Sequence, residues 1–258
     1  MFNLLSGVPL FRAFGIQVVM SWIFIVYAVF RVVNSGGRQD MAGEILWLVV
    51  LFGTVLVHEF GHSLTCKLFK GDAPVIVLWP LGGLAFVSPP NRPWPHLWTT
   101  VGGPATHLLM GPIWLVLYLF VVPFLPNAMW AEYFAVACIY GIAINIGLLA
   151  FNLIPAYPMD GGRILQELLW LTIGYRQSLM IAGMVGTVAG AGFVVIGLGL
   201  WPVKIPWLEF DPRTGVGWGH FTLGQGPSMM LFVIGIMCAL ESFGAYRRAQ
   251  ELEGWRKN

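Results

Sequence analysis

The sequence predicts an α-helical protein that crosses a membrane several times and carries a small membrane-associated β-sheet or hairpin. The first observation behind this fold class is composition. Of the 258 residues, 57% are apolar and only 10% are charged, whereas an average soluble domain has about 25% charged residues. So few charges would not keep a chain of this length in solution, so the bilayer is its expected solvent. The second observation is a series of apolar segments, each near the roughly 20 residues that cross a bilayer core.

These segments predict six transmembrane helices in a polytopic protein. Proline residues close the third segment, because proline removes a helix hydrogen bond. The fifth segment is rich in glycine, which allows neighbouring helices to approach closely. No internal repeat divides the chain, so residues 1–258 are expected to form a single domain. The six predicted spans are residues 18–34, 44–69, 98–122, 131–154, 179–201 and 228–246.

Two connections between the predicted spans have their own character. Residues 73–90 predict two short strands around a turn at Pro80–Gly83. This stretch is too apolar for an ordinary loop and too short to span, so we expect a re-entrant or interfacial hairpin. The early segment 7–19 could pair with it. Residues 202–227 are the longest polar interruption and predict an outer loop, with Trp207 and Trp218 at the membrane interface.

The distribution of basic residues predicts the orientation in the cell membrane. With a cytoplasmic N-terminus, ten basic residues lie inside and four outside, in agreement with the positive-inside rule. Both termini are then cytoplasmic, and so is the side toward which the site described next would open. The inner set is Arg12, Lys67, Lys70, Arg92, Arg163, Arg176, Arg247, Arg248, Arg256 and Lys257, and the outer set is Arg31, Arg38, Lys204 and Arg213.

The second apolar segment contains the motif H-E-x-x-H, formed by His58, Glu59 and His62. On a helix, histidines four residues apart lie on one face and can bind the same zinc ion. The glutamate beside the first histidine can act as general base on a water at the metal. Polar and ionisable groups at membrane depth are costly, so they indicate a functional site. The pattern therefore predicts a zinc-dependent hydrolytic centre.

A catalytic zinc usually has three protein ligands, and Asp160 is the candidate for the third. It lies in FNLIPAYPMDGGR, residues 151–163, where Pro155 and Pro158 must break the helix. Broken backbone at membrane depth is tolerated where it is buried in protein or lines a wet cavity. In the alternative interpretation, Asp160 only caps the helix that begins near Gly161. The residue types alone leave both interpretations open.

The two motifs together resemble the site-2 protease family of intramembrane zinc metalloproteases. That family pairs H-E-x-x-H with N-x-x-P-x-x-P-x-D-G, and NLIPAYPMDGG matches the second pattern position by position. The resemblance extends to PLGGLA at residues 80–85, to GGPATHLL at 102–109 and to the six-span layout. The resemblance is to a compact form of the family, which is expected to lack the PDZ domain and the nucleotide-sensing domain of many members.

The resemblance implies a zinc metalloendopeptidase with one zinc per chain. It implies His58, His62 and Asp160 as the ligands and Glu59 as the catalytic base. It also implies that Asn152 is catalytic, because it would hold the substrate strand or its carbonyl near the metal. The implied substrate is a single-span membrane protein, cleaved in regulated intramembrane proteolysis.

Three further expectations concern the surroundings of this site. His107, where family members often have asparagine, is interpreted as an interhelical hydrogen-bonding residue. An unwound substrate is expected to add as a strand to the edge of the 75–88 hairpin. The edge positions proposed for it are Val75, Val77, Phe86 and Val87.

Two other classes of protein are compatible with a membrane metal motif. A zinc transporter would need polar residues along a path through several spans, whereas here they cluster at one place. A catalytically inactive scaffold would tolerate loss of motif residues, whereas all are present. The expected partners are the lipid bilayer and a membrane-spanning protein substrate; a homo-oligomer is left open. The net charge of +2 is too small to indicate a nucleic-acid partner.

Overall fold

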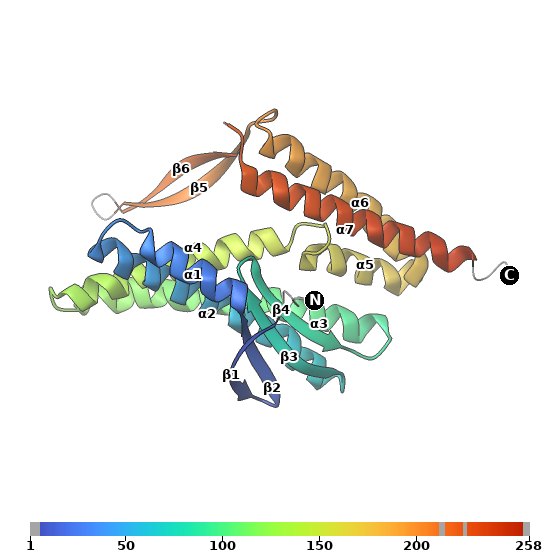
Figure 1. Ribbon diagram of the computed structural model, residues 1–258, viewed down its shortest axis with the longest axis horizontal. Helices are drawn as coiled ribbons and strands as arrows, with labels where there is room; N and C mark the ends of the chain where they lie inside the picture. The colour runs from blue at the N-terminus through green and yellow to red at the C-terminus, as the bar shows by residue number, and fades with distance from the viewer. Residues whose placement is uncertain (1–5, 212–214, 224–225, 255–258) are drawn as a thin grey trace. The chain divides into compact units, whose positions relative to one another are not determined.

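The computed structural model describes residues 6–211, 215–223 and 226–254, with the side chains of residues 38–40, 204–211, 215–223 and 253–254 left out (Figure 1). The chain forms two compact units, Met1–Phe151 and Asn152–Asn258, and each is described by itself. The expectation that residues 1–258 form a single domain stays a prediction.

The first unit contains a four-stranded sheet in the order β1-β2-β3-β4. Its strands are β1 (Gly7–Ala13), β2 (Ile16–Ser21), β3 (Asp72–Trp79) and β4 (Gly82–Ser88). The predicted hairpin is present as the antiparallel pair β3 and β4, and the early segment joins it through a parallel pairing of β2 with β3. Because β3 is paired on both sides, Val75 and Val77 are not edge positions, which corrects the expectation above. On this side of the sheet only β4 has a free edge.

The helices of the first unit are α1 (Trp22–Val33), α2 (Arg38–Leu68), α3 (Pro93–Phe120), the short η1 (Val122–Phe124) and α4 (Met129–Asn152). The strand β2 passes directly into α1, because the Ser21 hydroxyl accepts a hydrogen bond from the Phe24 N–H at 3.2 Å and caps the helix. Proline near the start of α3 lacks an N–H that would have no helical partner there.

Helix α1 packs along the N-terminal half of α2. The rings of Phe24 and Phe52 meet edge to face with centroids 4.1 Å apart, and Leu48 completes this buried cluster. Beyond it, Arg31 forms an ion pair with Glu44, and the same guanidinium lies 5.3 Å from the centre of the Trp47 ring. The charged contact therefore lies near the connection between the two helices.

The sheet packs against the other half of α2, the half that carries the metal motif. Val55 of α2 is buried with Ile16, Val18, Ile76 and Leu78 of strands β2 and β3. All of these are fully or almost fully buried. Phe60 within the motif and Ala85 of β4 pack against this core, which fixes the position of β4 beside Glu59.

Among the described residues, five helices are long and apolar enough to cross a membrane, which makes the chain a multi-pass membrane protein. The sixth predicted span, residues 18–34, is not confirmed. Its first residues belong to β2, and the remaining helix α1 has 12 residues. At 1.5 Å per residue α1 is about 18 Å long, less than the roughly 30 Å of a bilayer core.

The second unit consists of α5 (Asp160–Ile173), α6 (Tyr175–Gly197), β5 (Val203–Asp211), β6 (Gly215–Leu223) and α7 (Met229–Gly254). Helices α6 and α7 lie side by side (Figure 1). The glycines of α6 make this possible: a Cβ on Gly190 would lie 2.4 Å from the backbone nitrogen of Ala239. The predicted outer loop is instead an antiparallel hairpin of β5 and β6. The side chains of Trp207 and Trp218 lie outside the described set.

Candidate metal centre

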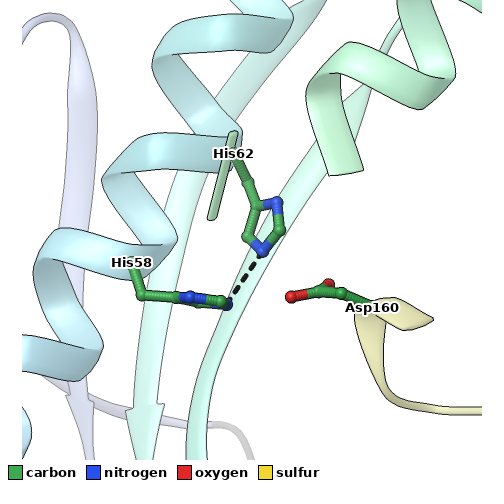
Figure 2. Close-up of side chains that lie close together, drawn as sticks. All are labelled: His58, His62 and Asp160. Atoms are coloured by element: carbon green, nitrogen blue, oxygen red, sulfur yellow. Dashed lines mark hydrogen bonds between the residues drawn. The ribbon is translucent and has the colours of Figure 1, made fainter. Parts of the chain in front are cut away.

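Helix α2 places the two motif histidines against each other. The Nε2 atoms of His58 and His62 are 3.0 Å apart, with the rings nearly perpendicular (Figure 2). His58, Glu59 and His62 are all buried, with 6–8% of their surface exposed. Buried polar groups of this kind require partners, and the contacts of each imidazole follow.

The protonation of His62 is set by a backbone carbonyl of α3. Its Nδ1 lies 2.8 Å from the Thr99 carbonyl oxygen, and a carbonyl can only accept a hydrogen bond. The Nδ1 of His62 therefore carries the hydrogen. In the neutral ring the lone pair is then on the Nε2 atom, which lies 3.0 Å from Nε2 of His58.

His58 is held by a chain of side chains on α3 and α4. Its Nδ1 lies 3.0 Å from Nε2 of His107, whose Nδ1 lies 2.9 Å from Oδ1 of Asn145. The Asn145 amide nitrogen donates to the Gly141 carbonyl at 2.7 Å, which fixes the orientation of the amide. Read from that carbonyl, His107 donates to Asn145 and His58 donates to His107. The Nε2 lone pair of His58 then faces that of His62.

This pair of facing lone pairs fits a metal ion. Two unprotonated imidazole nitrogens at 3.0 Å repel each other unless a proton or a cation lies between or beside them. Neutral imidazoles, each with the second nitrogen held by an acceptor, are the usual form of histidine as a metal ligand. The donor set is therefore consistent with a zinc site.

Helix α3 can approach the histidines only because Gly103 has no side chain. A Cβ at this position would lie 2.2 Å from Nε2 of His62 and 2.8 Å from Cε1 of His58. Gly61 and Gly102 lie where α2 and α3 cross. A Cβ added to either glycine would lie closer than 3.0 Å to the backbone of the other. Thr99, Gly103 and His107 are four residues apart, so one face of α3 covers both imidazoles.

Substituting alanine for Gly103 is expected to abolish metal binding while the protein remains folded in the membrane. The new methyl group would occupy the place of a ligand nitrogen, so His62 would have to move. Gly111→Ala in the same helix is the matched control, because its Cβ would meet its nearest neighbour at an ordinary 3.7 Å. Metal analysis of the two purified variants checks this. Equal zinc content would show that the imidazoles are not confined in this way.

Glu59 is tied to the edge strand of the sheet. Its Oε2 atom accepts a hydrogen bond from the Ala85 N–H of β4 at 2.8 Å. Gly83, two residues earlier, has no side chain where Glu59 lies, since a Cβ there would be 2.3 Å from Cγ of Glu59. The carboxylate is thus held next to the histidine pair by β4.

In the second unit, Asp160 is the first residue of α5. The N-cap position belongs to Met159, so the alternative in which Asp160 only caps the helix does not describe this turn. The two glycines that follow allow the turn to close. A Cβ on Gly161 would lie 2.4 Å from the Leu153 carbonyl, and one on Gly162 would lie 2.6 Å from the carbonyl carbon of Ala156.

Three of the predicted site residues form a group that could hold a metal ion. One ligand atom from each of His58, His62 and Asp160 lies within 4.8 Å of the others (Figure 2). All three side chains are buried. The predicted catalytic residue Asn152 is the last residue of α4 and is half-buried.

The loop between Asn152 and Asp160 is anchored within its own unit. The Tyr157 hydroxyl donates to Oε1 of Gln166 on α5 at 2.6 Å, and the Tyr157 N–H donates to the Ser242 hydroxyl of α7 at 3.0 Å. Burial raises the pKa of Tyr157, and the nearby Glu167 carboxylate raises it further. The phenol therefore stays protonated and keeps this donor.

Several residues around the site were not singled out from the sequence. The Thr99 carbonyl and the Ala85 N–H are backbone groups, which have no signature in the residue type. Gly103 and Asn145 do have a sequence signal, which is helical spacing. Gly103 lies one helical turn from His107, and Asn145 lies one helical turn from Gly141. The interhelical role expected for His107 is present, and one of its partners is the candidate ligand His58.

The chain is similar to known zinc metalloproteases. The model of peptidase family M50 matches residues 125–196, which include Asn152 and Asp160. A zinc metalloprotease of Methanocaldococcus jannaschii is 30% identical over 201 residues, 74% of this chain and 54% of the relative. The stage IV sporulation protein FB of Bacillus subtilis is 28% identical over 128 residues, 48% of this chain and 41% of the relative. The chain thus spans about half the length of the curated relatives it matches.

The fold has a counterpart among solved structures. The site-2 protease from Methanocaldococcus jannaschii superimposes with a TM-score of 0.59 over 93% of this chain and 95% of that one, at 22% identity. The fold and the site together define a multi-pass membrane protein with a buried metal-binding motif. By sequence the chain is similar to peptidase family M50 and its zinc metalloproteases, and by fold it is similar to a site-2 protease.

Proposed function

We propose that this chain is a zinc metalloendopeptidase that hydrolyses peptide bonds of single-span membrane proteins, in regulated intramembrane proteolysis. The observation that carries the proposal is the convergence of the His58 and His62 Nε2 atoms beside Glu59. The proposed ligands of one zinc ion are His58, His62 and Asp160. Cleavage of a single-span peptide by the purified chain tests the proposal, since neither a zinc transporter nor an inactive scaffold would cleave it.

The protein groups divide the chemistry among them. Zinc, when bound, lowers the pKa of a water toward about 7 and polarises the scissile carbonyl. The Glu59 carboxylate takes the proton of the attacking water and delivers it to the leaving amine. Asn152 donates to a substrate carbonyl and holds it in place. The burial of His58, Glu59 and His62 strengthens these electrostatic interactions by excluding bulk water.

The position of the motif along α2 supports a site inside the bilayer. Glu44, paired with Arg31, marks the polar end of the α1–α2 hairpin. At 1.5 Å per residue, His58 lies about 21 Å further along α2, within the roughly 30 Å of the hydrocarbon core and toward its other side. We propose that this other side is cytoplasmic, as are both termini, and that α1, too short to cross the core by itself, crosses it together with β2 as the sixth transmembrane segment. Of the basic residues counted for this orientation, Arg213, Arg256 and Lys257 lie outside the described residues.

Thiol labelling tests the orientation. Cysteines introduced at Leu68 and Arg92, both exposed, should react with impermeant reagents only from the cytoplasmic side. A cysteine at Asn34, in the α1–α2 connection, should react only from outside. The unmodified chain is the control, because Cys66, Cys138 and Cys238 are buried. The reverse labelling pattern would place the site on the outer side.

The free edge of β4 is the proposed substrate platform. Since the Ala85 N–H donates to Glu59, it points away from β3, and successive N–H groups of a strand alternate between its two edges. The N–H groups of Gly83 and Val87 therefore lie on the same free edge, whereas that of Phe86 faces β3. A strand added to this edge would have its peptide bonds beside the Glu59 carboxylate. An unwound substrate helix can supply such a strand.

Val87→Pro is expected to lower the cleavage rate about 3- to 10-fold, the effect of one lost hydrogen bond of about 0.5–1.5 kcal/mol. Zinc content should not change, because Val87 is not one of the proposed ligands. Val87→Thr is the matched control, since threonine keeps the β-branched shape and the N–H. Rates are measured with a single-span peptide in detergent. If Val87→Pro cleaves as fast as Val87→Thr, the substrate does not pair with this edge.

A further inference from the structure

We propose that His107 and Asn145 form a positioning relay that holds the His58 ring with its Nε2 atom directed toward the proposed metal site. The inference rests on the proposed zinc site but concerns residues to which that function assigns no role. The relay is a continuous chain of three hydrogen bonds from the Gly141 carbonyl to the His58 ring, with lengths of 2.7, 2.9 and 3.0 Å. His107 and Asn145 are almost completely buried, at 2% and 1% exposure.

The direction of every bond in the relay follows from its fixed end. A backbone carbonyl only accepts, so the Asn145 amide must present its nitrogen to Gly141 and its oxygen to His107. The Nδ1 of His107 then carries the hydrogen, and the Nε2 of the neutral ring accepts from His58. His58 is thereby left with its proton on Nδ1 and its lone pair on Nε2.

The two histidines of the motif are controlled in different ways. His62 donates directly to the Thr99 carbonyl, a partner that cannot change its role. His58 depends on an imidazole, which could present either an acceptor or an N–H. Asn145 removes this ambiguity, although it does not touch His58. The rings of His58 and His107 are also stacked, with centroids 4.9 Å apart, and this stacking fixes the rotation of the His58 ring.

The relay predicts that a residue two bonds away from the ligand changes metal affinity. His107→Leu removes the acceptor of the His58 N–H and should raise the zinc dissociation constant about 10- to 100-fold, as loss of an outer-sphere partner typically does. Asn145→Leu should raise it as well, because His107 can then present an N–H to His58. His107→Gln places an amide oxygen near the former Nε2 and should restore most of the affinity.

The experiment is a chelator competition for zinc, together with the visible spectrum of the cobalt-substituted protein, on the full chain in detergent. The control is Thr54→Val, which removes a buried hydroxyl bond of 2.8 Å on α2, one turn before His58. It should alter stability without altering the dissociation constant or the cobalt spectrum. Both readouts are independent of proteolysis, so they remain informative if the chain cleaves no peptide. An unmodified chain that binds no zinc would contradict the proposed function itself.

The results separate a relay from simple packing. The relay requires weakened zinc binding and an altered cobalt spectrum in both His107→Leu and Asn145→Leu, with effects that do not add in the double variant. Wild-type affinity and spectrum in folded His107→Leu would overturn it. Equal loss of affinity in His107→Gln and His107→Leu would also overturn it, because an acceptor alone would then not suffice. If leucine variants do not fold, the glutamine variant decides the question.

Discussion

Glu59→Gln is expected to retain zinc and to lose peptide hydrolysis by about 10²- to 10⁴-fold, the usual contribution of a general base. Glutamine preserves the shape of the side chain, and its amide oxygen can still accept from the Ala85 N–H. What it cannot do is take a proton from water. Zinc content and initial cleavage rate, measured on the same preparation, check this prediction.

Each alternative outcome for Glu59→Gln has a distinct meaning. Loss of zinc together with activity would place Glu59 among the metal ligands. Full activity with zinc bound would require another base near His58. A modest loss shared with Gly111→Ala, whose new Cβ would make only an ordinary contact at 3.7 Å, would indicate only general destabilisation.

His62→Ala is expected to remove the metal and with it all hydrolysis. It deletes one of three proposed ligands, so the loss of zinc affinity should exceed the roughly 10- to 100-fold that an outer-sphere partner contributes. Metal analysis and cleavage assays on the purified variant check this. His96→Ala, a histidine of α3 outside the motif, is the matched control and should keep both zinc and activity. Retained zinc in His62→Ala would show that the metal is bound elsewhere.

The metal motif could be predicted from the sequence because it depends on local geometry. Histidines four residues apart face the same way on any helix, and α2 is a regular helix through the motif. The break at Pro155 and Pro158 likewise follows from the chemistry of proline. The structure ends α4 at Asn152 and begins α5 at Asp160, as that chemistry requires.

Features that depend on long-range pairing were harder to predict. Residues 18–34 are mostly apolar, so a strand followed by a short helix has the same composition as one membrane span. The division at Ser21 becomes clear only because β2 pairs with β3, more than fifty residues away. The β5–β6 hairpin could not be predicted from residues 202–227, because Pro206 and several glycines weaken the strand pattern.

The residues that contact the motif also differ in how far the sequence predicts them. The polar residues His107 and Asn145 can be found in the sequence, but their link to His58 cannot. That link requires the α2–α3 crossing at Gly61 and Gly102. The Thr99 carbonyl and the Ala85 N–H could not be predicted, since every residue except proline has such groups. Only the fold shows which of them face the motif.

The most direct test of the account is hydrolysis of a single-span peptide in water enriched in oxygen-18. The zinc-loaded chain, reconstituted in lipid vesicles, should convert the peptide into two fragments. Mass spectrometry should find one heavy oxygen in the new carboxylate of the N-terminal fragment, and Glu59→Gln should produce almost none. An intact peptide in the presence of one bound zinc per chain, or equal cleavage by the Glu59→Gln variant, would contradict the proposal that this buried histidine pair and its glutamate catalyse peptide hydrolysis.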